Sequence, residues 1–374
     1  MRIAILSTFY PLRGGIAQFN ADLYNELGKS HTVKAFTFSR QYPQFLFPGK
    51  TQYVTSDDNA VPVDSDPVLD TANPFSWRRC ADAITGWKPD LLVMKYWMSW
   101  FAPSLGYVAR RIRKTGARTV SILDNVIPHE KRFFDGPFTK YFLSGCSGNI
   151  ALCREVSEDL VSLSPEAKYT ILPHPLYNHF GSAIPREEAE DRLGLPHGKR
   201  NLLFFGLIRD YKGLDILIDA FSLLDDSYTL TVAGEPYGSF EKYQKAIDLS
   251  PAKDRIRIFS RYIPDSEVKV FFSAADLTVL PYRSATQSGI SSISYNFDVP
   301  LVVTDTGGLK AAVGKTGTGL VAEKAEAGAI AREIRLFFSE PGLASLCREN
   351  IRKEKERLSW ASFARGLTDF AQSL

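Results

Sequence analysis

Short apolar runs alternate with segments of helical periodicity along the chain. At the start, "IAIL" is typical of an apolar strand, Gly14-Gly15 of a turn, and "IAQFNADLYNEL" of an amphipathic helix. Further strands are predicted at "TVKAFTF", "DLLVMKYW", "TVSILDN", "GNIALC" and "YTILPHP", with amphipathic segments between several of them. Strands that alternate with helices are typical of a parallel sheet covered by helices. The pattern therefore predicts one Rossmann-like α/β domain in the first half.

The alternation restarts near Lys199. Strands are predicted at "RNLLFFGLI", "YTLTVAG", "RIRIFS", "LTVLPY" and "PLVVTD", with helices such as "GLDILIDAFSLL" between them. Residues 173–200 carry several prolines and a short charged helix, which is typical of an interdomain connection. We predict two doubly wound domains, residues 1–180 and 181–356, with any ligand at the carboxyl ends of their strands.

Length and composition agree with this picture. A chain of 374 residues suits two domains of ordinary size, and a net charge of +3 gives no case for binding nucleic acid. The four cysteines lack metal-type spacing, so neither a zinc site nor a structural disulfide is expected. No apolar run has the length of a membrane span, and the start of the chain does not resemble a secretory signal. The sequence predicts a cytoplasmic protein.

Two basic residues follow the strand that ends at Gly206. Arg209 and Lys212 stand in the loop before a helix, where two cations and free backbone amides can meet a diphosphate. Exposed Arg and Lys residues are common, so a solvated loop explains the same pair. The phosphate interpretation therefore depends on the rest of the chain.

Five segments resemble the GT-B glycosyltransferases of group 1, also called family 4. They are "YPLRGGIAQFNADLYNEL", "GLIRDYKGLDILIDAF", "SAADLTVLPYRSATQSG", "DVPLVVTDTGGLKAAV" and "LSWASFARGLTDF", which are similar to the family's glycine-rich loop, phosphate segment, donor-site segment, following strand and C-terminal helix. The resemblance implies two Rossmann-like domains facing across a cleft, with residues 357–374 as a helix packing back on the N-terminal domain. It gives Arg209 and Lys212 a catalytic role at the leaving diphosphate, with Gly206 and Gly15 beside it.

The donor-site segment departs from the family in its acidic residues. Most members carry two glutamates eight positions apart, which the pattern places near Ala285 and Ile293. A slip of one residue gives Thr286 and Ser294, so no register restores a carboxylate. The resemblance then implies that the anion site is kept while recognition of the sugar changes.

A phosphate is still expected where this segment enters its helix. Unpaired amides at a helix N-terminus attract anions, glycine lets a phosphate approach closely, and hydroxyl or amide side chains add hydrogen bonds. A serine that only caps the helix explains the same residues without a ligand. The predicted donor-binding residues of this turn are Thr286, Gln287, Ser288, Gly289, Ile290 and Ser291.

In the first half, "SILDNVIPHEKRFF" ends a strand at Asp124. The family often has a histidine at or after this strand, beside the transferred sugar, and the resemblance makes His129 the candidate for that catalytic contact. A lone histidine that only braces its loop fits equally well. Asp124 and Asn125 are expected on the acceptor side. For the nucleotide base, the resemblance implies backbone contacts from Arg261, Tyr262 and Ile263.

No metal or other cofactor is expected. Asp64-Ser65-Asp66 matches the short acidic motif by which another glycosyltransferase fold, GT-A, binds a metal, but its flanking residues favour a surface loop. Basic residues mixed with aromatic ones in "GYVARRIRKTGAR", "FSWRRC" and "EKRFFDGPFTKYF" are compatible with contact to an anionic lipid surface or with an ordinary solvated face.

The resemblance therefore implies a retaining glycosyltransferase that moves a sugar from a nucleotide-diphosphate donor to a hydroxyl of a glycan or lipid-linked acceptor, in the synthesis of surface polysaccharide or glycoconjugates. Its expected partners are that donor, that acceptor and a membrane surface, which it would contact peripherally through the basic and aromatic residues of its first half. Two alternatives stay open. One is a nucleotide-sugar epimerase, which needs acid and base residues on both sides of the sugar. The other is a non-catalytic protein of the same fold that binds nucleotide or glycan.

Overall fold

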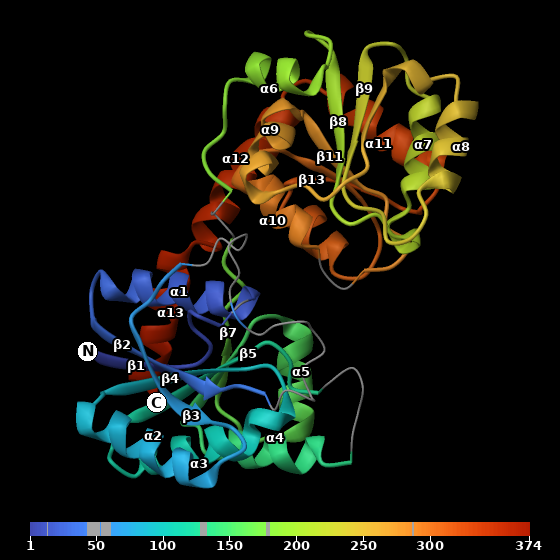
Figure 1. Cartoon of the computed structure of the whole chain (residues 1–374). Coiled ribbons are helices and arrows are strands. Elements are labelled where there is room, and N and C mark those ends of the chain that lie inside the picture. The colour runs from blue at the N-terminus through green and yellow to red at the C-terminus, as the bar shows by residue number, and fades with distance from the viewer. Residues whose placement is uncertain (13, 43–52, 54–60, 128–132, 177–179, 286–287) are drawn as a thin grey trace. The chain divides into compact units, whose positions relative to one another are not determined.

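The chain folds into two compact units. The computed structural model describes all residues except 13, 43–52, 54–60, 128–132, 177–179 and 286–287. One unit comprises residues 1–175 and 358–374, and the other residues 176–357. The divisions therefore lie within a few residues of the predicted ones, and residues 358–374 group with the first unit (Figure 1).

The first unit is built on a seven-stranded parallel sheet in the order β3-β2-β1-β4-β5-β6-β7. Its strands are β1 Arg2–Leu6, β2 Thr32–Arg40, β3 Ser65–Asp70, β4 Leu91–Tyr96, β5 Arg118–Leu123, β6 Gly148–Ala151 and β7 Tyr169–Ile171. Its helices are α1 Gly15–Gly28, α2 Pro74–Trp87, η2 Ser99–Phe101, α3 Ala102–Arg113, α4 Asp135–Leu143, α5 Arg154–Leu163 and α13 Trp360–Ser373.

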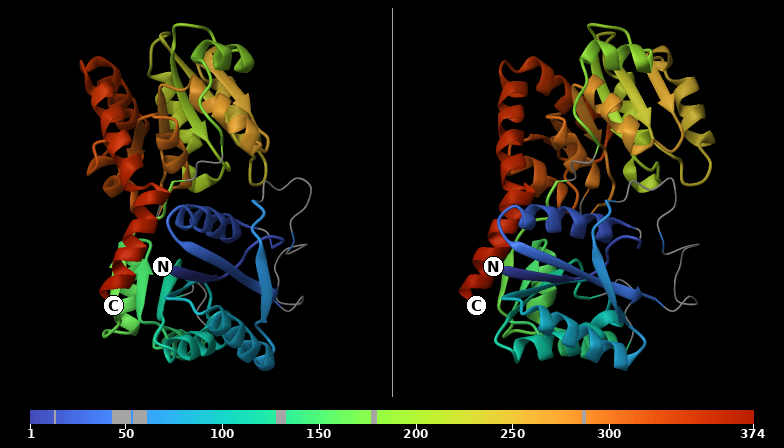
Figure 2. Two further views of the ribbon diagram at one scale, coloured as in Figure 1. Left: turned by 90° about the vertical axis from the view of Figure 1, so that its left-hand side faces the viewer. Right: turned by 60° about the vertical axis from the view of Figure 1, so that its left-hand side comes forward.

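Alternate residues of each strand face two apolar layers. On β4, Leu92 and Met94 pack with residues of α2, α3 and α4, whereas Leu91 and Val93 pack with residues of α1 and α13. Figure 2 shows α13, in red, beside the first sheet. Strands of a parallel sheet are buried on both faces and are usually apolar throughout. Lys95, the fifth residue of the fully buried strand β4, departs from that rule.

The second unit contains a six-stranded parallel sheet in the order β10-β9-β8-β11-β12-β13. Its strands are β8 Arg200–Phe205, β9 Tyr228–Ala233, β10 Ile256–Phe259, β11 Leu277–Leu280, β12 Leu301–Thr304 and β13 Gly319–Ala322. Its helical segments are α6 Arg186–Leu193, η3 Asp210–Lys212, α7 Leu214–Ser222, α8 Glu241–Leu249, η4 Lys253–Arg255, α9 Asp265–Ala274, α10 Gly289–Asn296, η5 Lys310–Gly314, α11 Ala327–Ser339 and α12 Leu343–Arg357.

Both sheets reverse their strand order at one point. In the first sheet the reversal lies between β1 and β4, and in the second between β8 and β11. Ligands of doubly wound sheets bind outside the carboxyl ends of the strands at this switch point, because the crossovers on its two sides leave in opposite directions. The predicted fold, two Rossmann-like parallel α/β domains, is confirmed, and each unit has one edge at which a site is expected.

Candidate functional site

Three predicted site residues converge at the switch point of the second sheet. Gly206 follows β8, Lys212 ends η3, and Ile290 lies in the first turn of α10, beyond β11. A Cβ atom built on Gly206 would lie 2.8 Å from Cδ1 of Ile290 and 3.4 Å from Nζ of Lys212. Gly206 also has a φ of 96°, which other residues rarely adopt. Glycine is therefore favoured here by its backbone conformation, and a Cβ atom would also crowd the side chain of Ile290.

The ammonium group of Lys212 is buried in this arrangement. The residue is 8% exposed, and Nζ lies 5.6 Å from the ring centroid of Tyr282. Burial, and secondly the charge of Arg209, lower the pKa of Lys212 to about 8. Among the described residues, Lys212 has no carboxylate partner. A buried cation without a counter-ion is costly, so this position is suited to a ligand that brings negative charge.

Arg209 lies on the exposed side of the same loop. Its guanidinium group is 4.2 Å from the ring centroid of Tyr237, which is 72% exposed. Tyr237 follows β9, and its backbone amide donates to the carbonyl of Ile208 (2.9 Å), so the two loops run together. The ring of Tyr237 packs on the face of the guanidinium group, so the N–H groups of Arg209 stay available for hydrogen bonds to a ligand. Arg209 and Lys212 therefore form a pair of cations, one exposed and one buried.

Close backbone contacts hold the Lys212 loop against the loop after β11. A Cβ atom on Gly213 would lie 2.1 Å from the carbonyl oxygen of Pro281, so this approach requires glycine. On the outer side, Arg283 donates from Nη1 to the carbonyl of Asp210 (2.7 Å) and to Oδ1 of Asp215 (3.0 Å). The Arg283 amide also donates to the carbonyl of Tyr211 (2.7 Å). Sequence reasoning missed Arg283, although it stands in the quoted donor-site segment.

The serines of the donor turn serve the helix itself. Ser288 is the N-cap of α10, and its Oγ accepts a bond from the amide of Ile290 (3.3 Å). The amide of Ser291 donates to the carbonyl of Ser288 (3.2 Å), and Oγ of Ser291 donates to the same carbonyl (2.5 Å). The expectation of unpaired amides at this helix N-terminus is therefore wrong for Ile290 and Ser291. Gly289 has no bond from its amide to another described residue.

The second position that the family pattern assigns to glutamate is Ile293 or, in the neighbouring register, Ser294. Ile293 packs against an apolar cluster beside α6 and α9. In the neighbouring register, Ser294 is fully buried, and its hydroxyl bonds to Thr278 (2.8 Å) and to the carbonyl of Val299 (2.8 Å). In either register the second acidic position is thus part of the core. Thr286 and Gln287 lie outside the described residues.

The residues predicted to contact the base follow strand β10. Tyr262 is 65% exposed, whereas Ile263 is buried in the apolar cluster beside α9. Arg261 forms an ion pair with Glu267 at the start of α9. The sequence predicts contacts to the base from the backbone of these three residues. Their side-chain arrangement does not test this, so it stays a prediction.

The switch point of the first sheet carries a buried ion pair. Nζ of Lys95 lies 2.8 Å from Oδ1 of Asp124, which directly follows β5. Asn125 is exposed, and His129 lies outside the described residues. A Cβ atom on Gly15, the first residue of α1, would meet nothing within 4 Å. Lys95 was not predicted, although a lysine inside the apolar run "DLLVMKYW" is itself an unusual signal.

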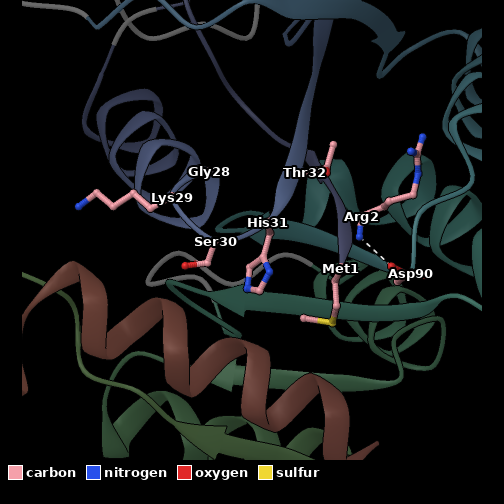
Figure 3. A pocket seen from close by; sticks show the side chains of 8 residues that line it. All are labelled: Met1, Arg2, Gly28, Lys29, Ser30, His31, Thr32 and Asp90. Carbon is pink, nitrogen blue, oxygen red and sulfur yellow. Dashed lines mark hydrogen bonds between the residues drawn. The ribbon is translucent and has the colours of Figure 1, made fainter.

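A separate hollow of about 490 Å³ lies at the opposite, amino-terminal edge of the first sheet (Figure 3). It is lined by Met1, Arg2, Asp90 and the residues between α1 and β2. The dashed line in Figure 3 marks the hydrogen bond from the backbone amide of Arg2 to Oδ2 of Asp90 (2.7 Å). Arg2 is further bound to the carbonyl of Trp87, and Lys29 pairs with Glu26.

No group of three or more potential metal ligands occurs among the residues that the structure describes. The acidic motif at residues 64–66 differs from its prediction, because Ser65 and Asp66 begin the edge strand β3 instead of lying in a loop. Asp66 pairs there with Lys34 on β2 (2.8 Å).

Residues 185–354 match the family described as glycosyl transferases group 1. The second unit is a group 1 glycosyl transferase domain. The resemblance inferred from the sequence is thereby confirmed, and the matched range contains the whole convergent site around Lys212.

Curated relatives of this glycosyl transferase domain are similar at moderate identity. D-inositol 3-phosphate glycosyltransferase 1 of Catenulispora acidiphila is 27% identical over 227 residues, 57% of this chain and 54% of that protein. A putative teichuronic acid biosynthesis glycosyltransferase, TuaC of Bacillus subtilis, is 27% identical over 217 residues, 58% of this chain and 53% of that protein. The chain spans about half the length of these relatives.

Solved structures extend the likeness in fold to both units. HepE of Anabaena, in complex with UDP, has a TM-score of 0.71 at 14% identity and covers all of both chains. Sucrose-phosphate synthase of Thermosynechococcus elongatus has a TM-score of 0.65 at 16% identity, over 100% of this chain and 99% of that one. At such low identity the likeness is one of fold, the two Rossmann-like units of GT-B glycosyltransferases.

Proposed function

We propose that the protein transfers a sugar from a nucleotide-diphosphate donor to a hydroxyl of a glycan or lipid-linked acceptor, in the synthesis of surface polysaccharide or glycoconjugates. The observation that carries this proposal is the buried ammonium of Lys212, which lies beside Gly206 and Ile290 at the switch point of a group 1 glycosyl transferase domain. HepE, of the same fold, was solved with UDP-glucose, which makes uridine nucleotides the first donors to test.

In this proposal Lys212 and Arg209 stabilise the charge that grows on the leaving diphosphate. Fixed cations in a partly dry site act strongly there, because they need not reorganise as the sugar–phosphate bond breaks. The amide of Gly289 adds a donor at the start of α10. The described part of the donor turn, Tyr282–Ala285 and Ser288–Phe297, has no carboxylate to act as a nucleophile. A retaining reaction in which the donor phosphate takes the acceptor proton fits this composition, and it requires no metal.

The experiment is a thermal-stability screen with UDP-, GDP- and ADP-sugars, followed by a transfer or hydrolysis assay with each stabilising donor. A ligand that binds only the folded state raises the melting temperature. The Arg209→Ala/Lys212→Ala double variant should lose this stabilisation. Unchanged donor affinity in that variant would refute the site. Tight binding without turnover for any donor would favour the non-catalytic alternative, and interconversion of sugar epimers would favour the epimerase.

A second part of the proposal is peripheral contact with an anionic membrane at the cytoplasmic face. The observation behind it is a hollow of about 480 Å³ between α2, α3 and α4, lined by basic and aromatic residues. Arg110 stacks on Tyr141 at 3.7 Å, and Arg111 pairs with Asp82. Among the described residues Lys114 has no such partner. Cations beside half-exposed aromatic rings suit the headgroup region of an anionic bilayer. No helix in the described part of the chain is long and apolar enough to cross a membrane.

Vesicle sedimentation tests this contact. The protein should co-sediment with phosphatidylglycerol-containing vesicles at low salt and less with pure phosphatidylcholine or at high salt. Arg111→Glu with Lys114→Glu should abolish sedimentation. The matched control, Lys245→Glu with Lys353→Glu, reverses two exposed charges of the second unit and should sediment like wild type. Equal sedimentation of both double variants would exclude this surface.

A further inference from the structure

A buried lysine lies at the carboxyl edge of the first sheet. Lys95 is 2% exposed on β4, and its ammonium lies 3.6 Å from the ring centroid of Phe19 on α1. Its ion-pair partner, Asp124, belongs to the neighbouring strand end, and the side chain of Asp124 is 22% exposed. Burial lowers the pKa of Lys95, and the charge of Asp124 opposes that shift. The pair thus keeps two charges inside the unit at the point where a ligand is expected.

Only half of the Asp124 carboxylate is used. Oδ1 accepts from Lys95, while Oδ2 is buried and has no hydrogen-bond partner among the residues that the structure describes. A buried acceptor without a partner costs free energy, and native proteins rarely leave one. Replacing a buried ion pair by apolar side chains is often neutral or stabilising, so the pair is not explained by stability alone. An unused carboxylate oxygen at a switch point indicates a missing donor.

Among the described residues, His174, after β7, is a further titratable group that interacts with this pair. Its ring packs on Phe19 with 5.0 Å between centroids, and Nδ1 lies 2.7 Å from the carbonyl oxygen of Pro175. Burial, and to a lesser extent Lys95, lower the pKa of His174, so the imidazole is neutral at pH 7. The cluster of Lys95, Asp124 and His174 therefore has no net charge, in contrast to the cationic pair in the second unit.

We propose that Lys95 is a positioning residue, which fixes Asp124 so that its free oxygen Oδ2 accepts a hydrogen bond from a hydroxyl of a neutral polyol or sugar. This rests on the proposed function, because it assigns the first unit a substrate of the same reaction. A carboxylate oxygen accepts hydrogen bonds and cannot donate them. It therefore attracts a hydroxyl donor, and its negative charge repels a phosphate placed beside it. A neutral hydroxylated ligand is thus favoured here over its phosphorylated form.

The test compares two variants with the wild type. Asp124→Asn alone leaves a buried lysine without its counter-ion and should lower the melting temperature. Lys95→Met with Asp124→Asn removes both charges and should restore stability. Saturation-transfer NMR on the UDP-loaded protein then reports binding of glucose, myo-inositol and myo-inositol 1-phosphate. Calorimetry with UDP reports separately on the second unit.

Wild type should bind glucose or myo-inositol, and prefer myo-inositol to its phosphate. The stable double variant should bind the neutral probe at least about tenfold more weakly, since a hydrogen bond to a charged group is lost, with unchanged UDP affinity. A purely structural pair would leave probe binding intact at restored stability. The proposal would be overturned by intact probe binding in the stable double variant. It would also be overturned if the wild type preferred the phosphate or bound neither neutral probe. Failure of wild type to bind UDP would instead contradict the proposed function.

Discussion

The two units share one topology but differ in charge at the edge where ligands are expected. Both sheets reverse their strand order beside the first strand of the unit, and both place a buried lysine there. In the second unit, Lys212 has no carboxylate partner among the described residues and has Arg209 nearby. In the first unit, Asp124 neutralises Lys95. In the proposals above, the shared fold provides the position, and the counter-ion decides whether that position attracts an anion or a neutral hydroxyl.

The largest expected effect comes from removing the buried cation. Lys212→Met should weaken UDP binding by about 10- to 100-fold, because a hydrogen bond to a charged group contributes roughly 1.5–3 kcal/mol. Titration calorimetry measures it. Lys242→Met is the matched control, since Lys242 is half-exposed and pairs with Asp210 on the outer side of the same loop. An equal loss in both variants would show that general positive charge, and not the buried position, governs binding.

The pH dependence of binding sharpens the same contrast. The pKa of Lys212 is lowered to about 8, so above that pH the free site must take up a proton to bind a diphosphate. UDP affinity should then fall toward about tenfold per pH unit, while Lys212→Arg, which stays charged, should show a flatter profile. A wild-type affinity that stays constant from pH 7 to about 9.5 would contradict the prediction.

The stability of the unliganded protein should rise with increasing pH, whereas UDP affinity falls. The folded pKa of Lys212 lies below its ordinary value of 10.5, so folding disfavours the ammonium form. The penalty is complete below about pH 8 and is relieved as the pH rises toward 10.5. Lys212→Met should therefore stabilise the unliganded protein at pH 7, with a smaller gain at high pH. Denaturant unfolding at several pH values measures the difference.

A smaller effect is expected from the residue that holds the site together. Arg283→Lys replaces a two-pronged contact with Asp215 and a bond to the Asp210 carbonyl by a single ammonium, so the Lys212 loop loses part of its support. UDP affinity should fall about three- to tenfold, with little change in melting temperature. Arg357→Lys, which alters a similar exposed contact to Glu354, should leave UDP affinity unchanged. Loss of stability without loss of affinity would make Arg283 purely structural.

Much of the fold follows from the sequence pattern, because buried parallel strands are nearly continuous apolar runs. The strands at "DLLVMKYW" and "RNLLFFGLI" were recognisable for this reason. The edge strand β3 was not predicted: "SDPVLD" is partly exposed and contains a proline, and it forms through pairing with β2, which the local sequence does not record.

Site residues that lie close together in the sequence could be predicted, whereas those that folding brings together from distant positions could not. Arg209 and Lys212 stand in one short loop, so the sequence indicated them, and the structure adds that Lys212 is buried. The pairs Lys95–Asp124 and Arg283–Asp215 join residues 29 and 68 positions apart. Such pairs depend on which strands become neighbours, and a periodicity argument cannot supply that.

The smallest effect concerns the serine-rich turn of the second unit. Ser288→Ala removes the cap of α10 and should cost about 1 kcal/mol of unfolding free energy. UDP affinity should change by less than about threefold, because the Ser288 hydroxyl already accepts the Ile290 amide and the anion is held by charge. Ser292→Ala, on the same helix, is the control for a hydroxyl without a capping role. A large loss of UDP affinity at unchanged stability would instead make the turn a direct phosphate ligand. The contrast between the units would then lie in hydroxyl donors as much as in counter-ions.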